Sequence, residues 1–452
     1  MPDSKPSLSD VLGRLVELGC TAAYVKVLAP NDNNKNQPYL SKSFEGLHIL
    51  PHGELTSEGE GERIRYKTSL NFAWLNDDLV PFVAPETKLI LYPQYPEVRL
   101  SGFLVGCKDA PSKLMTPRKE GYVIPPRILL LGVNERSGEV FAYLAVKGTA
   151  IFHELGESVH HSEKRGVLFD ITSQLPVTST KQQLINKLSD IAQMGWVVSK
   201  RLDKVGNILP CQAPNCGGCT LEAELDIRPN SRSEPDFLGW EVKQHGVTSF
   251  VGLADKLTTN KGAVITLMTP EPTAGVYVDD GVEAFIRRYG YPDQSGKVDR
   301  LNFGGKYVYG VPYHLTGVRL ITTGFNPDKG TMEGNGGISL LYGDEKVAAA
   351  EWKFSDLLRH WSKKHAKAVY VPSMCRKEPQ HSYRFADLVR LGEGTDFLRF
   401  LRAVHDGVVF YDPGIKLECA STTPKVKRRS QFRILSGNLP RLYDKMTIQS
   451  LN

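Results

Sequence analysis

The chain has 452 residues, of which 41% are hydrophobic and 23% are charged, with 41 Gly and 28 Pro. This length indicates two domains or three, and a composition close to the globular average excludes collagen-like, coiled-coil and wholly disordered chains. The net charge of +6 permits a polyanionic partner without requiring one.

No apolar run approaches the ~20 residues that a membrane-spanning helix needs, and the N-terminal segment lacks the basic and apolar regions of a secretory signal. We therefore expect a protein of the cytoplasm. Its seven Cys are few and odd in number, which favours reduced thiols over a framework of disulfides.

The first third of the chain is predicted to consist of one helix followed by short strands. The amphipathic run SLSDVLGRLVELG predicts a helix over 7–19. Strands are expected over AAYVKVLA (22–29), FEGLHIL (44–50), KLILY (88–92), PEVRLSGFLVG (96–106), RILLLGV (127–133) and EVFAYLAVKG (139–148). Many short strands without helices between them predict a mainly β domain, a barrel or a sandwich.

The domain boundary is expected near the polar runs HELGESVHHSEKRG and LPVTSTK, which gives a first domain over 1–160, a linker over 161–180 and a second domain over 181–452. Helical periodicity then begins at Thr180, a suitable N-cap, and stops at Gly195. Further helices (219–226, 355–366, 395–407) and strands (263–268, 308–315, 337–343) predict an α/β second domain. A strand passing directly into a helix is expected over 347–361.

The most informative stretch carries Asp236, Glu241 and Lys243, with Glu222 on a predicted helix before it. Glu241 and Lys243 are separated by one residue, so on a strand they project from the same face. Two carboxylates suit a hard divalent ion, and an ammonium can orient or activate a water beside a phosphate, so the group suits phosphodiester hydrolysis. On the short pattern alone, an exposed strand with one Glu–Lys neighbour pair is the commoner explanation.

The wider context favours a nuclease. The segment resembles the PD-(D/E)xK nuclease site, here Pro235-Asp236 followed by Glu241-Val-Lys243. It is similar in particular to the MvaI/BcnI restriction endonucleases and to the mismatch-repair nicking enzyme MutH, which share three further features with this chain. These are a helix ending in Gly-Trp (Gly195-Trp196), a Gly-containing loop before the helix-borne Glu (215–220), and a distal segment ending in Phe-Arg-Ile (432–434).

This resemblance implies a restriction-endonuclease-like α/β fold for the second domain, with magnesium as the cofactor. It implies that Asp236 and Glu241 ligate the ion, that Glu222 assists metal or water binding, and that Lys243 positions the attacking water.

Cys211, Cys216 and Cys219 leave a zinc site open as an alternative. A structural zinc site usually needs two paired couples of ligands, and the sequence offers no second couple. The favoured interpretation is that Cys216 and Cys219 replace small loop residues of the family.

A basic segment lies just before the Phe-Arg-Ile residues. A basic run is usually a solvated face, but the resemblance implies that this segment reads bases, since Arg can bond guanine edges and Lys can neutralise phosphates. The expected DNA-contacting residues are Lys425, Lys427, Arg428, Arg429, Gln431 and Arg433. The related enzymes tend to carry His where this chain has Val426 and Arg428, which leaves the individual base contacts open.

Two polar, basic loops of the first domain are either ordinary surface loops or DNA-reading arms. Most of residues 8–150 resembles the EcoRII effector domain, a DNA-binding pseudobarrel also found in plant transcription factors, in which two arms grip the major groove. The expected DNA-contacting residues are Lys26, Asn31, Asp32, Asn33, Asn34, Lys35, Gln37, Arg99, Lys108, Lys113, Arg118 and Lys119.

The combined resemblance implies a type IIE restriction endonuclease. Such an enzyme would be a monomer with two sites for double-stranded DNA, one in each domain, and the target implied by both families is CC(A/T)GG. Two rivals remain: a MutH-like nickase, which would lack a separate DNA-reading domain, and a DNA-binding protein with an inert nuclease site.

Overall fold

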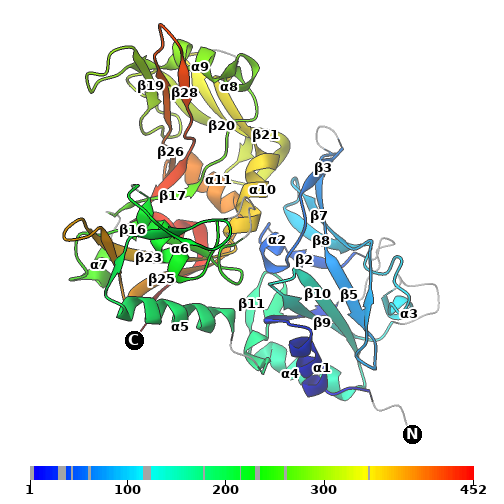
Figure 1. The fold of residues 1–452 in the computed structure, drawn as a ribbon. Helices are drawn as coiled ribbons and strands as arrows, with labels where there is room; N and C mark the ends of the chain where they lie inside the picture. The colour runs from blue at the N-terminus through cyan, green and yellow to red at the C-terminus, as the bar shows by residue number, and fades with distance from the viewer. Residues whose placement is uncertain are drawn as a thin grey trace. The chain divides into compact units, whose positions relative to one another are not determined.

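The structure is a computed structural model that describes residues 5–28, 37–41, 44–59, 63–115, 124–176, 179–213, 215–229, 235–258, 262–344 and 347–451. The chain forms two compact units that divide between Lys187 and Leu188 (Figure 1). Within the described ranges, no helix is both long and apolar enough to span a bilayer.

The first unit is built on two β-sheets (Figure 1). One has seven strands in the order β11-β12-β1-β9-β10-β5-β6, and the other has five in the order β2-β8-β7-β4-β3. In the larger sheet β10 and β5 pair in parallel. The strands are β1 Ala22–Leu28, β2 Tyr39–Ser41, β3 Thr56–Glu58, β4 Arg65–Ser69, β5 Asn71–Leu75, β6 Pro81–Val83, β7 Lys88–Tyr92, β8 Glu97–Ser101, β9 Arg127–Asn134, β10 Glu139–Val146, β11 Glu163–Arg165 and β12 Leu168–Asp170. The mainly β prediction for this unit is confirmed.

The helices of this unit are α1 Leu8–Glu17, α2 Gly46–Ile49, α3 Ser112–Met115, α4 Ala150–His160 and the 3-10 helix η2 Thr172–Gln174. The predicted N-terminal helix is α1. It starts with a capping box, in which the Ser7 hydroxyl accepts from the Asp10 N–H and the Asp10 carboxylate accepts from the Ser7 N–H. It packs close to β9 because Gly132 has no side chain: a Cβ there would lie 2.4 Å from a Leu15 methyl.

One expectation for the first unit is wrong. The run FEGLHIL forms the one-turn helix α2 rather than a strand, since a short apolar run suits either structure. The polar run expected near the boundary begins inside α4, whose Ile151 and Leu155 are buried at helical spacing in the core.

The segment 161–180, expected to be a linker, is structured for most of its length. It contributes β11 and β12 to the seven-stranded sheet, where Tyr24 of β1 is paired with Asp170. Leu168 and Ile171 are fully buried, which explains why this segment is held against the unit. The two compact units divide seven residues beyond it, inside helix α5 Thr180–Gln193.

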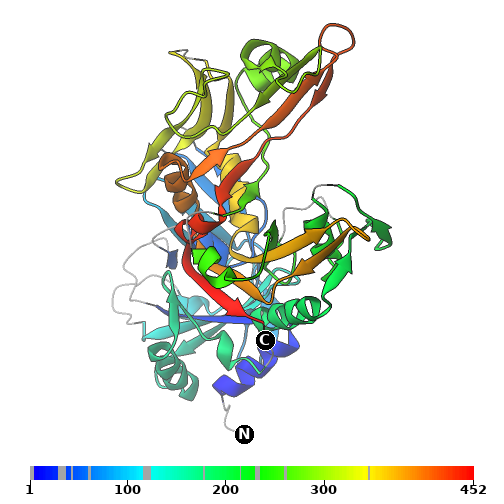
Figure 2. The same ribbon diagram turned by 90° about the vertical axis from the view of Figure 1, so that its left-hand side faces the viewer.

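The second unit contains a central sheet and four smaller ones. The central sheet has the order β13-β24-β23-β25-β30, with β16 paired in parallel to β23. Figure 2 shows β30, in red, running to the C-terminus at its edge. The smaller sheets are β14-β15, β17-β29-β26, β18-β19-β27-β28 and β20-β21-β22.

The strands of this unit are β13 Trp196–Val198, β14 Lys200–Leu202, β15 Ile208–Pro210, β16 Glu241–Gly246, β17 Val264–Met268, β18 Tyr291–Pro292, β19 Arg300–Gly304, β20 Val318–Asn326, β21 Thr331–Tyr342, β22 Ala350–Lys353, β23 Lys367–Arg376, β24 Ser382–Phe385, β25 Leu388–Thr395, β26 Val409–Tyr411, β27 Gly414–Glu418, β28 Lys425–Lys427, β29 Phe432–Leu435 and β30 Tyr443–Ser450. Its helices, beside the end of α5, are α6 Cys216–Glu224, α7 Leu253–Thr258, α8 Val276–Asp279, α9 Gly281–Tyr289, α10 Phe354–Lys364, α11 Phe397–His405 and the 3-10 helix η3 Ser436–Leu442.

The predicted mixture of helices and strands is confirmed here. Helices α5, α6, α10 and α11 lie where periodicity placed them, and β22 passes directly into α10. The strand expected over 308–315 is wrong: Tyr309 makes a single bridge to Leu320. Pro312 lacks the N–H that a ladder requires, and Gly310 has a φ of +73°.

Candidate active site

The site is organised by a tight turn that precedes β16. Phe237 and Trp240 exchange two backbone hydrogen bonds, of 2.9 and 2.8 Å, across the turn residues Leu238 and Gly239. Both turn residues have positive φ, 45° and 84°, as the two central residues of a type I′ hairpin turn require. The turn brings the Asp236 carboxylate back to the strand, where its Oδ2 accepts the Val242 N–H at 3.0 Å.

Glu241 and Lys243 lie on the same face of β16, as their spacing predicted. Lys243 Nζ is 2.6 Å from Glu241 Oε1, and the two side chains are 24% and 1% exposed. In the neighbouring strand β23, Glu241 is paired with Ala368 and Lys243 with Tyr370. The buried carboxylate therefore has a cationic partner that still reaches the surface.

The other three predicted catalytic residues, Glu222, Asp236 and Glu241, all act on this lysine. Burial alone would lower the pKa of Lys243, but attraction and a hydrogen bond from Glu241 outweigh it, with added attraction from Asp236 and Glu222, so the pKa is raised. The ammonium is therefore charged at neutral pH. The structure thus brings these four residues into one electrostatic group.

Helix α6 carries Glu222 and lies against β16 at close range (Figure 1). A Cβ on Gly217 would lie 2.7 Å from Oε1 of Gln244 on β16, so a larger residue there would require the end of the Gln244 side chain to move. The helix is also fixed by Thr220, whose hydroxyl accepts the Lys200 N–H of β14 at 3.1 Å. Glu222 itself is half-buried.

The cysteines before this helix differ from the expectation of reduced thiols. Cys211 and Cys216 form a disulfide with their Cα atoms 5.7 Å apart, a usual separation. It joins the loop after β15 to the first residue of α6. Cys219 is a free, partly buried thiol, so the three cysteines are not available together as metal ligands.

The three carboxylates do not form a complete metal cage. Across the described ranges, no group of three or more His, Cys, Asp or Glu side chains is spaced to hold a metal ion. Carboxylate oxygens nevertheless have the chemistry that Mg²⁺ prefers, and this ion is commonly held by one or two carboxylates, with waters and phosphate oxygens as the other ligands. Asp236 and Glu241 each supply a carboxylate of this kind.

Sequence reasoning missed the polar residues beneath this site. His245 follows Lys243 on the same face of β16, and Tyr370 of β23 is paired with Arg390 of β25. The hydroxyls of Tyr370 and Tyr443 are 2.8 Å apart and buried. Burial above all, and then the charge of Glu241, raise the pKa of Tyr370. Alternation along β16 could have pointed to His245, but no sequence signal pairs the distant strands.

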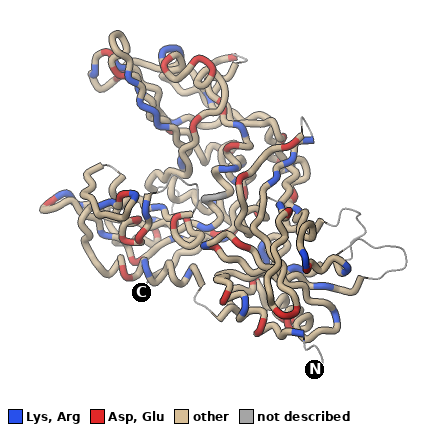
Figure 3. The backbone as a smooth tube through the Cα atoms, turned by 45° about the vertical axis from the view of Figure 1, so that its right-hand side comes forward, with Lys and Arg blue, Asp and Glu red and all other residues tan. Residues whose placement is uncertain are grey.

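The predicted DNA-reading segment spans β28, β29 and the residues between them. Lys425, Arg428 and Arg429 are exposed, and Lys427 is ion-paired with Glu418 of the adjacent strand β27 at 2.8 Å. Figure 3 shows Lys and Arg repeated along the strands of this part of the unit.

Two arginines of the segment also bond neighbouring side chains of the protein. Arg429 donates to the Gln431 side chain at 3.0 Å. Arg433 is 21% exposed and forms an ion pair with Asp412 at 2.5 Å. The exposed cations are therefore better placed than Arg433 to meet DNA.

The predicted contacts of the first unit are described only in part: Asn31, Asp32, Asn33, Asn34, Lys35, Arg118 and Lys119 lie outside the described residues. Lys108 and Lys113 are exposed. Burial, with repulsion from Lys164, lowers the pKa of Lys26 to about 8.

Gln37 lies just before β2, and Arg99 lies on the neighbouring strand β8 of the five-stranded sheet. Gln37 donates to Ser101 at 3.1 Å, and Arg99 of β8 is paired in register with Tyr39 of β2. Arg99 is also ion-paired with Glu97 at 2.6 Å.

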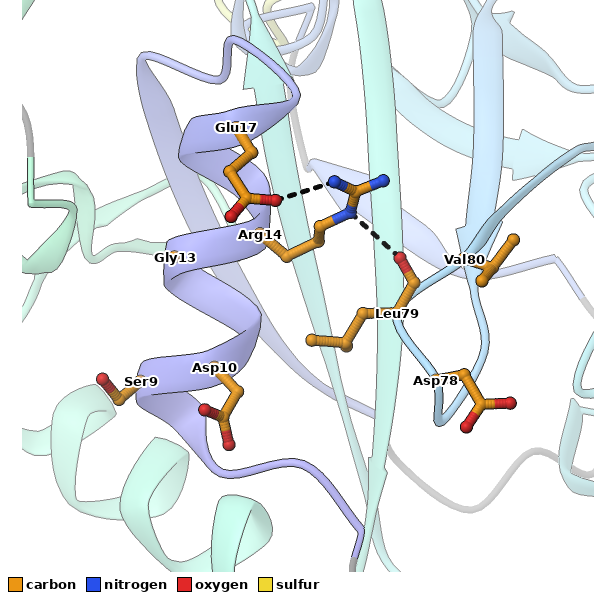
Figure 4. A pocket seen from close by; sticks show the side chains of 8 residues that line it. All are labelled: Ser9, Asp10, Gly13, Arg14, Glu17, Asp78, Leu79 and Val80. Atoms are coloured by element: carbon orange, nitrogen blue, oxygen red, sulfur yellow. Dashed lines mark hydrogen bonds and ion pairs between the residues drawn. The ribbon is translucent and has the colours of Figure 1, made fainter.

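A shallow surface pocket of about 520 Å³ lies elsewhere in the first unit, between α1 and the turn after β5 (Figure 4). Its charged lining is mainly acidic, with Asp10, Glu17 and Asp78. Arg14 crosses it to bond Glu17 at 2.7 Å and the Leu79 carbonyl at 3.2 Å. None of the predicted DNA-contacting residues lines it, and its acidic character does not suit DNA.

Comparison with known proteins places this geometry in a family. Residues 185–443 match the MvaI/BcnI restriction endonuclease family. Two similar solved structures are a complex of restriction endonuclease MvaI with cognate DNA substrate (16% identity, 60% of this chain and 99% of that chain, TM-score 0.44) and MvaI in the absence of DNA (15%, 60% and 98%, TM-score 0.32). No curated protein matches the chain.

Proposed function

The chain belongs to the MvaI/BcnI restriction endonuclease family, and from this premise we propose that it is a magnesium-dependent type II restriction endonuclease that cleaves double-stranded DNA. The observation that carries the proposal is the convergence on Lys243, which pairs with Glu241 and is attracted by Asp236 and Glu222. The Lys243 ammonium lies among three carboxylates and still reaches the surface. Such a group can meet a phosphodiester and suits its hydrolysis.

Each residue has a distinct role in this proposal. Asp236 and Glu241 would hold a magnesium ion, with Glu222 assisting through metal or water. The ion supplies a Lewis acid that offsets charge on the phosphate. Lys243 carries a fixed positive charge and donates hydrogen bonds, so it can hold the attacking water and balance the charge that develops on the phosphate oxygens.

The first unit would act as an effector domain. We propose that it is a pseudobarrel of the EcoRII effector type, which binds a second copy of the recognition site and makes the enzyme type IIE. Its mainly β architecture supports this assignment, as do Gln37, just before β2, and Arg99, on the neighbouring strand β8. Gln can bond adenine edges and Arg guanine edges, and the target proposed is CC(A/T)GG.

Two alternatives are less well supported. A MutH-like nickase would need no separate DNA-reading domain, whereas this chain has a first compact unit of its own. A DNA-binding protein with an inert site would have no reason to keep a buried Glu241 paired with Lys243, because burying an ion pair is costly.

Cleavage of a plasmid of known sequence tests the proposal. The purified protein is incubated with supercoiled plasmid and Mg²⁺, and the ends are mapped. A monomer with one active site should cut the strands in succession, so a nicked form should accumulate before linear DNA. Lasting nicks in one strand alone would favour the nickase, and intact plasmid would favour the inert protein.

Stimulation by a second DNA copy tests the effector role. Full-length protein should cut a single-site plasmid faster when a short duplex carrying CC(A/T)GG is added, and a scrambled duplex of equal length should have no effect. If both duplexes act alike, the first unit is not an effector domain.

A further inference from the structure

On the sheet face that carries Glu241, the neighbouring strands have small residues. Glu241 on β16 is paired with Ala368 on β23, and Ala368 is paired with Gly392 on β25. Residues paired across strands point to the same face of a sheet. The two positions beside Glu241 in this row are therefore Ala and Gly, which leave open space next to its carboxylate.

The ring of Tyr443 fills this space. A Cβ on Gly392 would lie 2.8 Å from Cδ2 and Cε2 of the Tyr443 ring, so the ring lies flat against the glycine, on the Glu241 side of the sheet. Any larger side chain at 392 would displace it. The glycine thus allows an aromatic side chain from β30 to reach toward Glu241.

Tyr370 completes a pair of hydroxyls on that face. It is paired with Lys243, so it lies in the row next to that of Glu241. The hydroxyls of Tyr370 and Tyr443 are 2.8 Å apart, and the two residues are 0% and 3% exposed. The charge of Glu241 acts on both phenols.

Of the two hydroxyl hydrogens in this pair, only one is used in the bond between the phenols. One hydroxyl donates to the other, and the one that accepts still carries its own hydrogen, because a phenol ordinarily keeps its proton up to about pH 10. A buried donor needs an acceptor, and the anion whose charge acts on both phenols is Glu241.

We infer that Tyr370 and Tyr443 are positioning residues, whose linked hydroxyls orient the Glu241 carboxylate from below while Lys243 holds its Oε1. The inference rests on the proposed function, since it assigns a role to the shell behind the metal-binding carboxylate. Outer partners of this kind fix the direction of the ligating oxygens, and their loss typically weakens metal affinity or activity about 10- to 100-fold.

The test is made on the full-length protein. It compares the wild type with Tyr370→Phe, with Tyr443→Phe and with the double variant. Each change removes one hydroxyl and keeps the ring. Tyr307→Phe is the matched control, because Tyr307 is also fully buried and hydrogen-bonded, to Thr316 at 3.2 Å, in another part of the unit. Binding of Mn²⁺, measured by electron paramagnetic resonance without DNA, is read beside single-turnover cleavage over a range of Mg²⁺ concentrations.

We expect Mn²⁺ affinity to fall about 10- to 100-fold in either single variant and the Mg²⁺ concentration for half-maximal cleavage to rise in step. The double variant should lose little more than a single one, since the hydroxyls act as one chain. Tyr307→Phe should match the wild type.

Three results would overturn the inference. The first is wild-type Mn²⁺ binding in both single variants. The second is a loss of Mn²⁺ affinity in the double variant that equals the sum of the losses in the two single variants. The third is a loss of affinity that merely accompanies a lower unfolding temperature and that Tyr307→Phe shows as well. A wild-type protein that neither binds Mn²⁺ nor cuts DNA would instead refute the proposed function, and the inference with it.

Discussion

Nζ of Lys243 lies 2.6 Å from Oε1 of Glu241, so a carboxylate that is only 1% exposed is balanced by a lysine that reaches the surface. Removing the lysine would leave a buried negative charge without a counter-charge, which costs about 3–5 kcal/mol. Lys243→Ala would therefore change stability as well as chemistry. A sharper test of the site changes a charge and keeps the geometry.

Asp236→Asn meets this requirement. The Asn side-chain oxygen can still accept the Val242 N–H that Asp236 Oδ2 accepts at 3.0 Å, so the turn should survive while the negative charge is lost. We expect cleavage in Mg²⁺ to fall at least 100-fold, with DNA binding in Ca²⁺ and the unfolding temperature nearly unchanged. Asp236→Ala, which also loses the hydrogen bond, should be less stable than Asp236→Asn. Cleavage by Asp236→Asn at a near wild-type rate would show that the site is misassigned.

The turn before β16 gives a prediction about stability. Leu238 has a φ of 45°, and a left-handed conformation costs a residue other than Gly or Asn roughly 1–2 kcal/mol. Leu238→Asn should raise the free energy of unfolding by ~0.5–1 kcal/mol, and Gly239→Ala should lower it by ~1 kcal/mol. Urea denaturation of the two variants measures this. A destabilised Leu238→Asn would mean that packing of the leucine side chain outweighs the backbone strain.

His245 predicts how stability depends on pH. Neither ring nitrogen has a hydrogen-bond partner among the residues that the structure describes, and burial, together with the charge of Arg390, lowers the pKa of His245 to about 3. The unfolded value is about 6.5, so below pH 6.5 the unfolded chain binds a proton that the folded chain does not. Stability is then complete above pH 6.5 and falls as pH drops from 6.5 toward 3, by up to about 1.4 kcal/mol per unit.

The variant His245→Leu isolates this contribution. It removes the titrating group from a buried position that offers it no hydrogen bond. The difference in unfolding free energy between wild type and variant should be flat above pH 7 and should shift in favour of the variant at pH 5. A difference that does not vary with pH would contradict the assignment.

The proximity of the proposed catalytic residues could be predicted because they lie close together in sequence. The spacing of Glu241 and Lys243 placed them on one face of a strand, and the turn at Leu238–Gly239 brings Asp236 to the same strand within a few residues. Tyr370 and Tyr443 could not be predicted in this way. They are brought to the sheet face that carries Glu241 only by the order of strands β16, β23, β25 and β30, and strand order is not encoded in local periodicity.

The features of the fold that the sequence analysis did not predict also have local causes. The helix α4 was missed although Ile151 and Leu155 have helical spacing, because polar residues dominate the run around them. The disulfide of Cys211 and Cys216 was missed because a small odd number of cysteines suggests reduced thiols, while the pairing depends on the turn between β15 and α6.

The last prediction separates two arginines of the DNA-reading segment. Arg428 is exposed, whereas Arg433 is ion-paired with Asp412 at 2.5 Å. If Arg428 reads a base, Arg428→Ala should weaken binding to the cognate duplex by about 1–3 kcal/mol and leave a scrambled duplex less affected. Arg433→Ala should instead destabilise the protein, because it leaves Asp412 without its partner.

Mobility shifts in Ca²⁺ on cognate and scrambled duplexes, beside thermal unfolding, measure both effects. The double variant Arg433→Ala with Asp412→Ala removes both charges and should recover stability relative to Arg433→Ala alone. If the double variant is stable and still loses binding to the cognate duplex alone, Arg433 must leave its ion pair with Asp412 and contact a base when DNA is bound. If Arg428→Ala weakens both duplexes equally, Arg428 contacts phosphate, and the base-reading role of this exposed cation is wrong.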